Sequence, residues 1–373
     1  RQVETLNCKN LSEAYLWREK MEEILLKYIG SNTPALVVLL GQEAWSAYLS
    51  QDPDKVQHMP ALCGLVSRNT LILPKDSTSL QNWEPENKDI YTDFPGYNIV
   101  GGYVYEYNLE KNIQLVQRFY PNTSKILFLS DNTFGGVCMQ TWLKKEMQKF
   151  PEYELELLDG RRQTFMEVNG RIRSVSDSTC VLVGTWRVDC TEDYVLGNTT
   201  YMLHDANPEL PVFTLSSVGL GNWALGGYMP DYCTQGKELA NDCIDYLERD
   251  TRQKVCIHKI PNGYVFDVKR IHECGVDSIS LPKDTRLVNR TIPFIEQYKY
   301  EVIVVVSIII FLIVCLLMAL FYISHIRKLR SHLRQQGEEL HQAKDKAEES
   351  DRLKSAFLAL SLIHISEPTR LRR

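Results

Sequence analysis

The sequence lacks the cysteine pattern of a metal centre or a disulfide-built scaffold. Its ten cysteines stand singly and form no CxxC pair, and nine of them, an odd number, precede the hydrophobic run at residues 302–323. Disulfide scaffolds carry even numbers of cysteines, whereas zinc sites need four closely spaced ligands. We therefore expect no metal site, and we expect most cysteines to be small buried apolar side chains.

An excess of basic residues is also absent. The chain has 42 Lys and Arg against 47 Asp and Glu, a formal net charge of −5, and no basic stripe interleaved with aromatic residues. Nucleic-acid-binding domains use such stripes to neutralise phosphates. The composition therefore argues against a nucleic-acid partner.

Charge is missing altogether from residues 302–323, which read VIVVVSIIIFLIVCLLMALFYI. As a helix rising 1.5 Å per residue, this run crosses the roughly 30 Å of hydrocarbon in a bilayer. The ten residues after it contain Arg327, Lys328 and Arg330 and no acid, whereas basic and acidic residues balance before it. The positive-inside rule therefore predicts a single-pass span with a cytoplasmic C-terminal side.

Residues 1–295 are then predicted to form an extracytoplasmic domain, large enough for two lobes that each bury a core. Such a domain must be exported, yet the chain opens at Arg1 without a methionine or a signal peptide. We expect that an N-terminal segment is missing.

This outer region repeats one pattern, a short apolar run followed by an amphipathic segment of helical length. Such alternation predicts βα units around a parallel sheet, and hence an α/β fold. The runs occur at residues 34–41, 124–131, 178–186, 210–217 and 224–230.

Ligands of such sheets bind beyond the carboxyl ends of the strands. Residues at these ends also cap the following helix, and capping is the interpretation that we favour for any single one. As a set, aromatic, amide and charged groups on one rim favour a ligand-binding site. The candidates are Gln42, Glu43, Ser67, Arg68, Asp131, Asn132, Thr133, Phe134, Trp186, Arg187, Ser216, Ser217, Tyr228 and Asp231.

Residues 219–224, GLGNWA, satisfy a relaxed GxGxxG/A dinucleotide pattern. The fingerprint requires a helix to begin there, so that its amides hold pyrophosphate. Another apolar run, residues 224–230, follows instead. We therefore expect no nucleotide site at this place.

Three stretches resemble the sensor domains of bacterial membrane histidine kinases, in particular those related to ABC-transporter substrate-binding proteins. They are residues 100–136, 225–247 and 281–303, the last containing NRTIPFIEQYKYE before the span. The resemblance implies a bilobed periplasmic-binding-protein-like fold of two Rossmann-like lobes that close on a small molecule. It also implies that the lobes meet near residues 99–104 and 224–230. The identity of the ligand stays open.

Residues 324–359 are predicted to form a cytoplasmic signalling helix. Their apolar and small residues recur at alternating steps of three and four, which predicts a marginal two-stranded coiled coil and a homodimer. The alternative is a solvated single helix. The residues at these heptad positions are Ile326, Leu329, Leu333, Gln336, Leu340, Ala343, Ala347 and Ser350.

The end of this helix, ESDRLKSAFLA at residues 349–359, resembles the lead into the dimerisation helix of histidine kinases. In that family a block close to NMSHEIRTPL follows and carries the phosphoacceptor histidine. Here residues 360–373 read LSLIHISEPTRLRR, and His364 is followed by Ile rather than Glu. The segment resembles a translation of a transposase adaptor used in preparing sequencing libraries. We expect an artefact there and no catalytic residue in the chain, with ATP and Mg²⁺ needed only by the missing kinase domain.

The sequence thus predicts the sensor portion of a two-component histidine kinase in the bacterial inner membrane. Its expected partners are a small periplasmic ligand, a second copy and a cognate response regulator. One alternative is a membrane-anchored solute-binding protein that serves an ABC transporter, which would need no signalling helix. Another is an animal receptor cyclase, but the residues after the span do not fit one.

Resequencing the gene past the codon for Ala359 is expected to recover the phosphoacceptor block in place of residues 360–373. The reason is that the family motif breaks off at the point where the adaptor-like sequence begins. A genomic read that continues through residues 360–373 into a stop codon would contradict this expectation.

Overall fold

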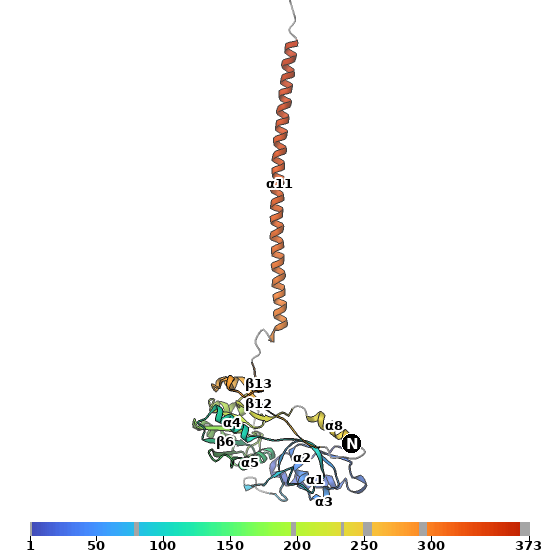
Figure 1. Ribbon diagram of the computed structural model, residues 1–373, viewed down its shortest axis with the longest axis vertical. Helices are drawn as coiled ribbons and strands as arrows, with labels where there is room; N and C mark the ends of the chain where they lie inside the picture. The colour runs from blue at the N-terminus through green and yellow to red at the C-terminus, as the bar shows by residue number, and fades with distance from the viewer. Residues whose placement is uncertain are drawn as a thin grey trace, which may run out of the picture. The chain divides into compact units, whose positions relative to one another are not determined.

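The computed structural model describes residues 2–77, 82–194, 199–232, 235–248, 256–290 and 297–365 (Figure 1). The chain divides into two compact units, Arg1–Arg290 and Thr291–Arg373. The predicted end of the outer domain at residue 295 lies outside the described residues, as does most of the adaptor-like segment, residues 366–373.

The described residues of the first unit form two lobes, and the range of each lobe covers described residues only. Lobe 1 comprises residues 2–105 and 235–259 and is built on a parallel sheet of order β1-β2-β5-β11. Its strands are β1 (Val37–Leu40), β2 (Ala61–Ser67), β5 (Ile99–Tyr105) and β11 (Ile257–Lys259), with a separate hairpin of β3 (Asn69–Leu71) and β4 (Asn87–Asp89). Its helices are η1 (Leu11–Glu13), α1 (Ala14–Leu26), η2 (Gly30–Asn32), α2 (Gln42–Leu49), α3 (Pro53–Val56) and α8 (Gln235–Glu248).

The two faces of the lobe 1 sheet are covered by different helices. On one face, Trp17 of α1 and Trp45 and Tyr48 of α2 form a buried apolar cluster. On the other face, Leu239 and Tyr246 of α8 pack against the sheet. Burial on both faces explains why β2 is apolar along most of its length.

Lobe 2 comprises residues 109–230 and 262–290. Its sheet has the order β13-β12-β10-β9-β8-β6-β7 and is parallel except for the antiparallel pair β10 and β12. The strands are β6 (Lys125–Ser130), β7 (Glu154–Asp159), β8 (Thr179–Val183), β9 (Val212–Thr214), β10 (Gly226–Pro230), β12 (Asn262–Asp267) and β13 (Arg286–Val288). The helices are α4 (Leu109–Phe119), α5 (Phe134–Met147), α6 (Phe165–Arg173), α7 (Thr199–Ala206), α9 (Val268–Glu273) and η4 (Ser278–Ser280).

The α/β prediction is confirmed. All five apolar runs contain strands, namely β1, β6, β8, β9 and β10, and parallel pairing dominates both sheets. In β6, Ile126 and Phe128 face one apolar cluster while Leu127 and Leu129 face the other, as expected of a strand buried on both faces. The GLGNWA segment leads into strand β10 rather than a helix, so it lacks the geometry of a dinucleotide fingerprint.

The crossings between the lobes that the structure describes lie at residues 106–108, 231–232 and 260–261, and two of them follow directly after the predicted meeting points. Residues 99–104 and 224–230 are themselves strands. Ladder pairing continues to Tyr105, opposite Ser67, and to Pro230, opposite Asn262, so the chain leaves each sheet only after these residues.

The last described residues of the first unit are tied to lobe 2. Strand β13 pairs with β12, and the side-chain amide of Asn289 donates to Asp267 Oδ2 at 2.6 Å and to the Gly221 carbonyl at 3.0 Å. Asn289 has a φ of 51°, a left-handed conformation that asparagine tolerates. Residues 286–290, the described end of the first unit, therefore belong to lobe 2.

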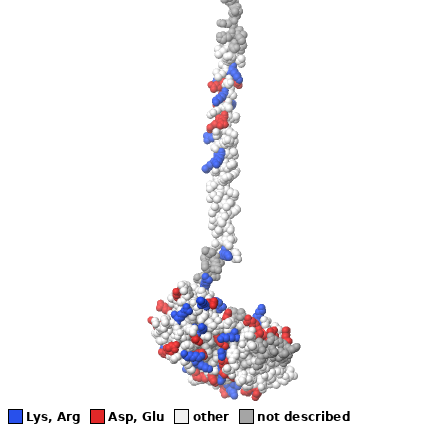
Figure 2. Space-filling view, viewed as in Figure 1, with Lys and Arg blue, Asp and Glu red and all other residues white. Residues whose placement is uncertain are grey.

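The second unit is one long helix, α11 (Lys299–Ile365), which includes the predicted span at residues 302–323. It is long and apolar enough to cross a membrane. Figure 2 shows a stretch of this helix without acidic or basic side chains, followed by a charged stretch. Phe311 is 65% exposed and Ile310 56% exposed, and apolar side chains exposed around a whole helix suit a lipid environment.

Candidate functional site

In lobe 1, two of the predicted site residues hold the turn after β2. Gln42 accepts a hydrogen bond from the Ser67 amide at 2.7 Å and donates to the Asn69 carbonyl at 3.0 Å. The Ser67 hydroxyl donates to the same carbonyl at 2.9 Å. The bonds satisfy backbone groups where the chain leaves the sheet. Ligand contact by Gln42 or Ser67 stays a prediction.

Arg68 and Glu43 lie beside this turn. Arg68 donates to Asp89 at 2.7 Å and to Glu106 at 3.4 Å, and its guanidinium lies 5.0 Å from the centre of the Tyr91 ring. Glu106, which begins the first crossing, also pairs with Lys259 at the third. Arg68 therefore links lobe 1 to the crossings, while Glu43 lies half-buried in the first turn of α2.

In lobe 2, Asp131 organises the carboxyl ends of β6 and β8. Its carboxylate accepts hydrogen bonds from the Thr133 hydroxyl at 2.6 Å, the Thr185 hydroxyl at 2.7 Å and the Arg187 amide at 2.8 Å. Burial raises the pKa of Asp131 and outweighs these bonds, which act to lower it. Thr133 also caps α5 by accepting from the Gly136 amide at 3.1 Å.

The remaining strand-end residues of lobe 2 line the same rim. Asn132 donates to the Asp189 carbonyl at 3.2 Å, and within the described part of the chain neither its side-chain oxygen nor the indole NH of buried Trp186 has a hydrogen-bond partner. Ser216 donates to the Gly184 carbonyl at 2.6 Å. The neighbouring Ser217 has a φ of 99° and donates its amide to the Thr214 hydroxyl at 3.1 Å. The side chain of Arg187 is exposed.

Tyr228 and Asp231 lie at different places relative to the end of β10. Tyr228 lies within β10 rather than at its end, which corrects the prediction, and its ring packs 4.7 Å from that of Tyr264 on the antiparallel neighbour β12. Asp231 follows the strand, and its amide donates to the Pro261 carbonyl at 2.9 Å, so it joins the second and third crossings.

Phe134 is the predicted residue that contacts both lobes. It begins α5, a helix of lobe 2, yet its ring is buried in the apolar cluster of lobe 1 at 6.3 Å from Trp17. Burying a phenylalanine ring stabilises by about 1.5–3 kcal/mol. We define the seam between the lobes by the strand ends named above and the start of α5. At Phe134 the two lobes are in contact across this seam.

A row of aromatic residues near the crossings was not predicted. Tyr105 ends β5 and lies 5.5 Å from Tyr107 and 5.4 Å from Tyr232, while Tyr107 lies 5.7 Å from Trp142 of α5. Burial raises the pKa of Tyr232 to about 12 and the pKa values of Tyr105 and Tyr107 further, so the hydroxyls are uncharged at neutral pH. The alternation Tyr103-Val-Tyr105-Glu-Tyr107 was the available signal.

Arg161 was also missed. It follows β7, whose sequence ELELLD at residues 154–159 mixes leucine with acidic residues and was not among the apolar runs recognised, and it is 2% exposed. Its guanidinium donates to Asp159 at 2.9 Å, to Gln140 at 2.6 Å and to the Trp83 carbonyl of lobe 1 at 2.5 Å. Burial opposes ionisation of Asp159, but the hydrogen bond and charge of Arg161 lower its pKa overall.

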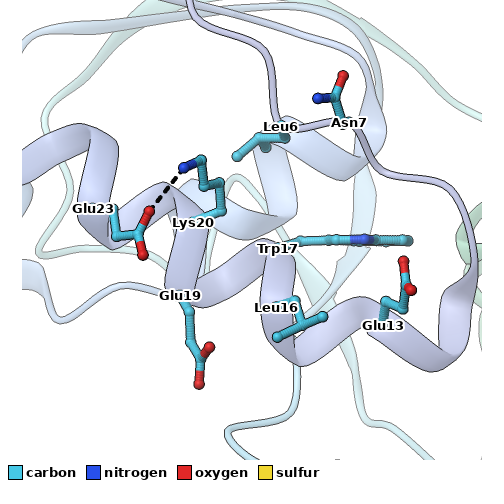
Figure 3. A pocket seen from close by; sticks show the side chains of 8 residues that line it. All are labelled: Leu6, Asn7, Glu13, Leu16, Trp17, Glu19, Lys20 and Glu23. Atoms are coloured by element: carbon cyan, nitrogen blue, oxygen red, sulfur yellow. Dashed lines mark hydrogen bonds and ion pairs between the residues drawn. The ribbon is translucent and has the colours of Figure 1, made fainter.

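A cavity of about 300 Å³ lies away from the strand ends, on α1 and the preceding segment, and its lining includes Trp17, Glu13, Lys20 and Glu23 (Figure 3). No group of three His, Cys, Asp or Glu able to hold a metal occurs in the described ranges. The seam, with uncharged tyrosine hydroxyls and aromatic rings, has the chemistry to bind a small organic molecule by stacking and hydrogen bonds.

No family model and no curated protein sequence matches the chain. Similar solved structures include a conserved domain protein from Vibrio cholerae, with 14% identity and a TM-score of 0.48 over 74% of this chain and 84% of that one. A ligand-free, open substrate-binding protein with adhesive properties from Clostridium difficile has 15% identity and a TM-score of 0.47, covering 74% and 84%. An ABC domain in complex with L-Trp from Streptococcus pneumonia has 14% identity and a TM-score of 0.48, covering 73% and 86%.

Replacing Arg161 is expected to destabilise the first unit. Arg161→Met removes the buried cationic partner of the Asp159 carboxylate and leaves only the exposed Arg162, 3.8 Å away. Breaking a buried pair costs about 3–5 kcal/mol in the free energy of unfolding. Urea unfolding of residues 1–290, followed by tryptophan fluorescence, measures the loss.

The neighbouring Arg162 provides the matched control. Its side chain is 51% exposed, pairs with Glu84 at 3.0 Å and lies 3.8 Å from the Asp159 carboxylate, and such exposed pairs contribute less than about 1 kcal/mol. Equal losses for Arg162→Met and Arg161→Met would contradict the structural role assigned to Arg161.

Proposed function

We propose that the chain is the sensor portion of a bacterial two-component histidine kinase, in which a small molecule binds at the seam between lobes 1 and 2. The observation that carries the proposal is the seam itself. Side chains from the strand ends of both lobes gather there beside the chain crossings, and aromatic residues of lobe 1, lobe 2 and the crossings adjoin. Ligands of bilobed α/β proteins bind at such a place.

The ligand would act through its different affinities for two arrangements of the lobes, because binding shifts an equilibrium only by that difference. Arg68, Glu106 and Lys259 join the strand ends to the first and third crossings, so they would respond to a rearrangement. Asn289 ties the pre-membrane segment to lobe 2, which makes lobe 2 the lobe that would pass movement to the membrane segment.

The output side of the proposal rests on α11. The basic residues after residue 323 favour a periplasmic first unit and a cytoplasmic C-terminal part of α11. Leu329, Leu333 and Leu340, which lie at the heptad positions of α11, are 52%, 59% and 74% exposed in the single chain. A second copy paired along these positions would bury them. A homodimer would place two kinase domains together, and phosphate would then pass to a cognate response regulator.

Ligand binding is expected to raise the melting temperature of the full chain in detergent micelles. At a hundred times its dissociation constant, a ligand adds about 2.7 kcal/mol, which corresponds to roughly 5 °C or more for a unit of this size. The screen covers sugars, amino acids and autoinducer-like compounds. Tyr105→Ala should reduce the shift, whereas Tyr201→Ala, 53% exposed on α7, should not. A flat response across the panel counts against direct binding.

Pairing of α11 is expected to appear as disulfide cross-linking between two copies in membranes. In a Cys315→Ser background, Leu333→Cys lies on the heptad seam and should cross-link several-fold faster than Gln335→Cys, which lies off it. Non-reducing electrophoresis after mild oxidation gives the rates. A membrane-anchored solute-binding protein needs no paired helix, so equal rates for the two variants would favour that alternative.

A further inference from the structure

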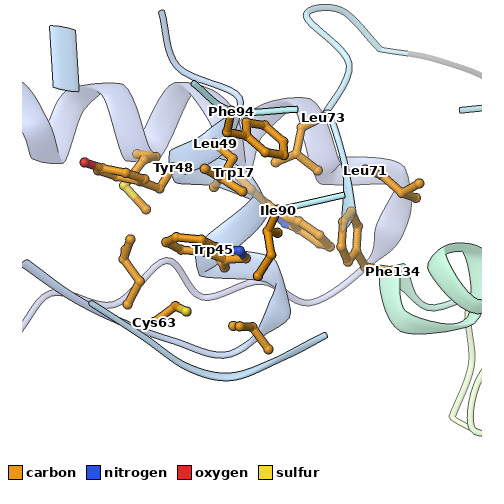
Figure 4. Packing of buried hydrophobic residues seen from close by; sticks show 14 of the residues in the cluster. Trp17, Trp45, Tyr48, Leu49, Cys63, Leu71, Leu73, Ile90, Phe94 and Phe134 are labelled. Carbon is orange, nitrogen blue, oxygen red and sulfur yellow. The ribbon is translucent and has the colours of Figure 1, made fainter. Parts of the chain in front are cut away.

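The two lobes share one helix. The first turn of α5 belongs to the core of lobe 1, where Phe134 and Val137 are each 1% exposed and Cys138 is 4% exposed. Figure 4 shows Phe134, next to the α5 ribbon, lying near Leu71 and Trp17 of lobe 1. Further along, Met139, Trp142, Leu143 and Met147 of the same helix belong to the core of lobe 2. A rigid helix that fills two cores resists their separation.

Polar contacts surround this apolar contact. The Cys138 thiol lies 3.9 Å from the Asn69 carbonyl and 3.8 Å from the Gln42 side-chain amide. One turn further along α5, the Asn87 amide lies 3.5 Å from the Thr141 hydroxyl. Gln42, one of the predicted ligand contacts, therefore has its amide directed at lobe 2.

Charged groups close the outer edge of the seam. Arg161 of lobe 2, held by Asp159, donates to the backbone carbonyl of Trp83 in lobe 1. The next residue, Glu84, pairs with Lys144 at 2.9 Å and with Arg162 at 3.0 Å. Lys144 lowers the pKa of Glu84 despite partial burial, so this carboxylate is ionised at neutral pH. Apolar, polar and ionic contacts thus join the lobes along α5 and the end of β7.

We propose that α5 serves as an internal substitute for a ligand, so that the ligand-free chain rests with its lobes closed. Phe134 occupies the place in lobe 1 where an aromatic or aliphatic group of a ligand would otherwise pack. A ligand that enters the seam must displace this ring and open the contact, instead of drawing two separated lobes together. This sensing step rests on the proposed function, whereas the closed resting state does not.

The closed state can be measured without any ligand by cross-linking across the seam. The full chain in detergent micelles carries Asn87→Cys and Thr141→Cys and reacts with a short bis-maleimide, and mass spectrometry of the digest quantifies the linked peptides. The expected result is rapid linkage of most molecules. The Asn87→Cys and Thr141→Cys single variants are the controls, because any linkage that they give must involve a native cysteine such as Cys138.

Two further substitutions test which contacts keep the lobes closed. Phe134→Ala should slow linkage several-fold, while Met166→Ala, 67% exposed on α6, should leave it unchanged. Because Phe134→Ala removes a core residue and risks unfolding, Lys144→Glu provides a second route: it sets like charges against each other at Glu84 without touching the core. Lys145→Glu, on an exposed neighbour, is its control.

Slower linkage with Phe134→Ala and Lys144→Glu, but not with their controls, would support closure by α5. Slow linkage in the folded parent, or equal rates for Lys144→Glu and Lys145→Glu, would overturn it. Failure of the ligand screen would contradict the proposed function without affecting the cross-linking result. The proposed function and the closed resting state are therefore tested separately.

Discussion

The contact of Phe134 with lobe 1 is the constraint on which the rest of the first unit depends. Helix α5 belongs to lobe 2 by its strand connections, yet its first turn completes the core of lobe 1. Because interiors are close-packed, the two sheets cannot separate while this ring stays in the core of lobe 1. The hydrogen bond from Arg161 to the Trp83 carbonyl joins the lobes at a second place.

Polar residues at the strand ends would have to serve both the backbone and a ligand. Chain segments leaving a buried sheet expose backbone groups that must be hydrogen-bonded, and Asp131, Gln42 and Ser216 meet that demand. A residue committed in this way has little capacity left for a ligand. The aromatic row from Tyr105 to Trp142 has fewer such obligations, because ring faces bind by contact and the tyrosine hydroxyls remain uncharged.

Helix α11 combines two environments in one continuous element. Residues 302–323 carry no charge, while the helix beyond them carries charges on most faces and a weak apolar seam. At 1.5 Å per residue the helix extends about 100 Å, and Gly337 is its only glycine. The helix also contains no proline, which would interrupt its backbone hydrogen bonds.

The sequence alone determined the α/β class, the five recognised strands and the apolar helix, because hydrophobic periodicity and length are local properties of the chain. It did not reveal β12 as an antiparallel partner of β10, or the buried Arg161, because register and burial depend on neighbours distant in sequence. Whether Phe134 would face a ligand or another core was likewise decided only in three dimensions. Its place at a strand end fits both, and the outcome follows from how closely the two lobes pack.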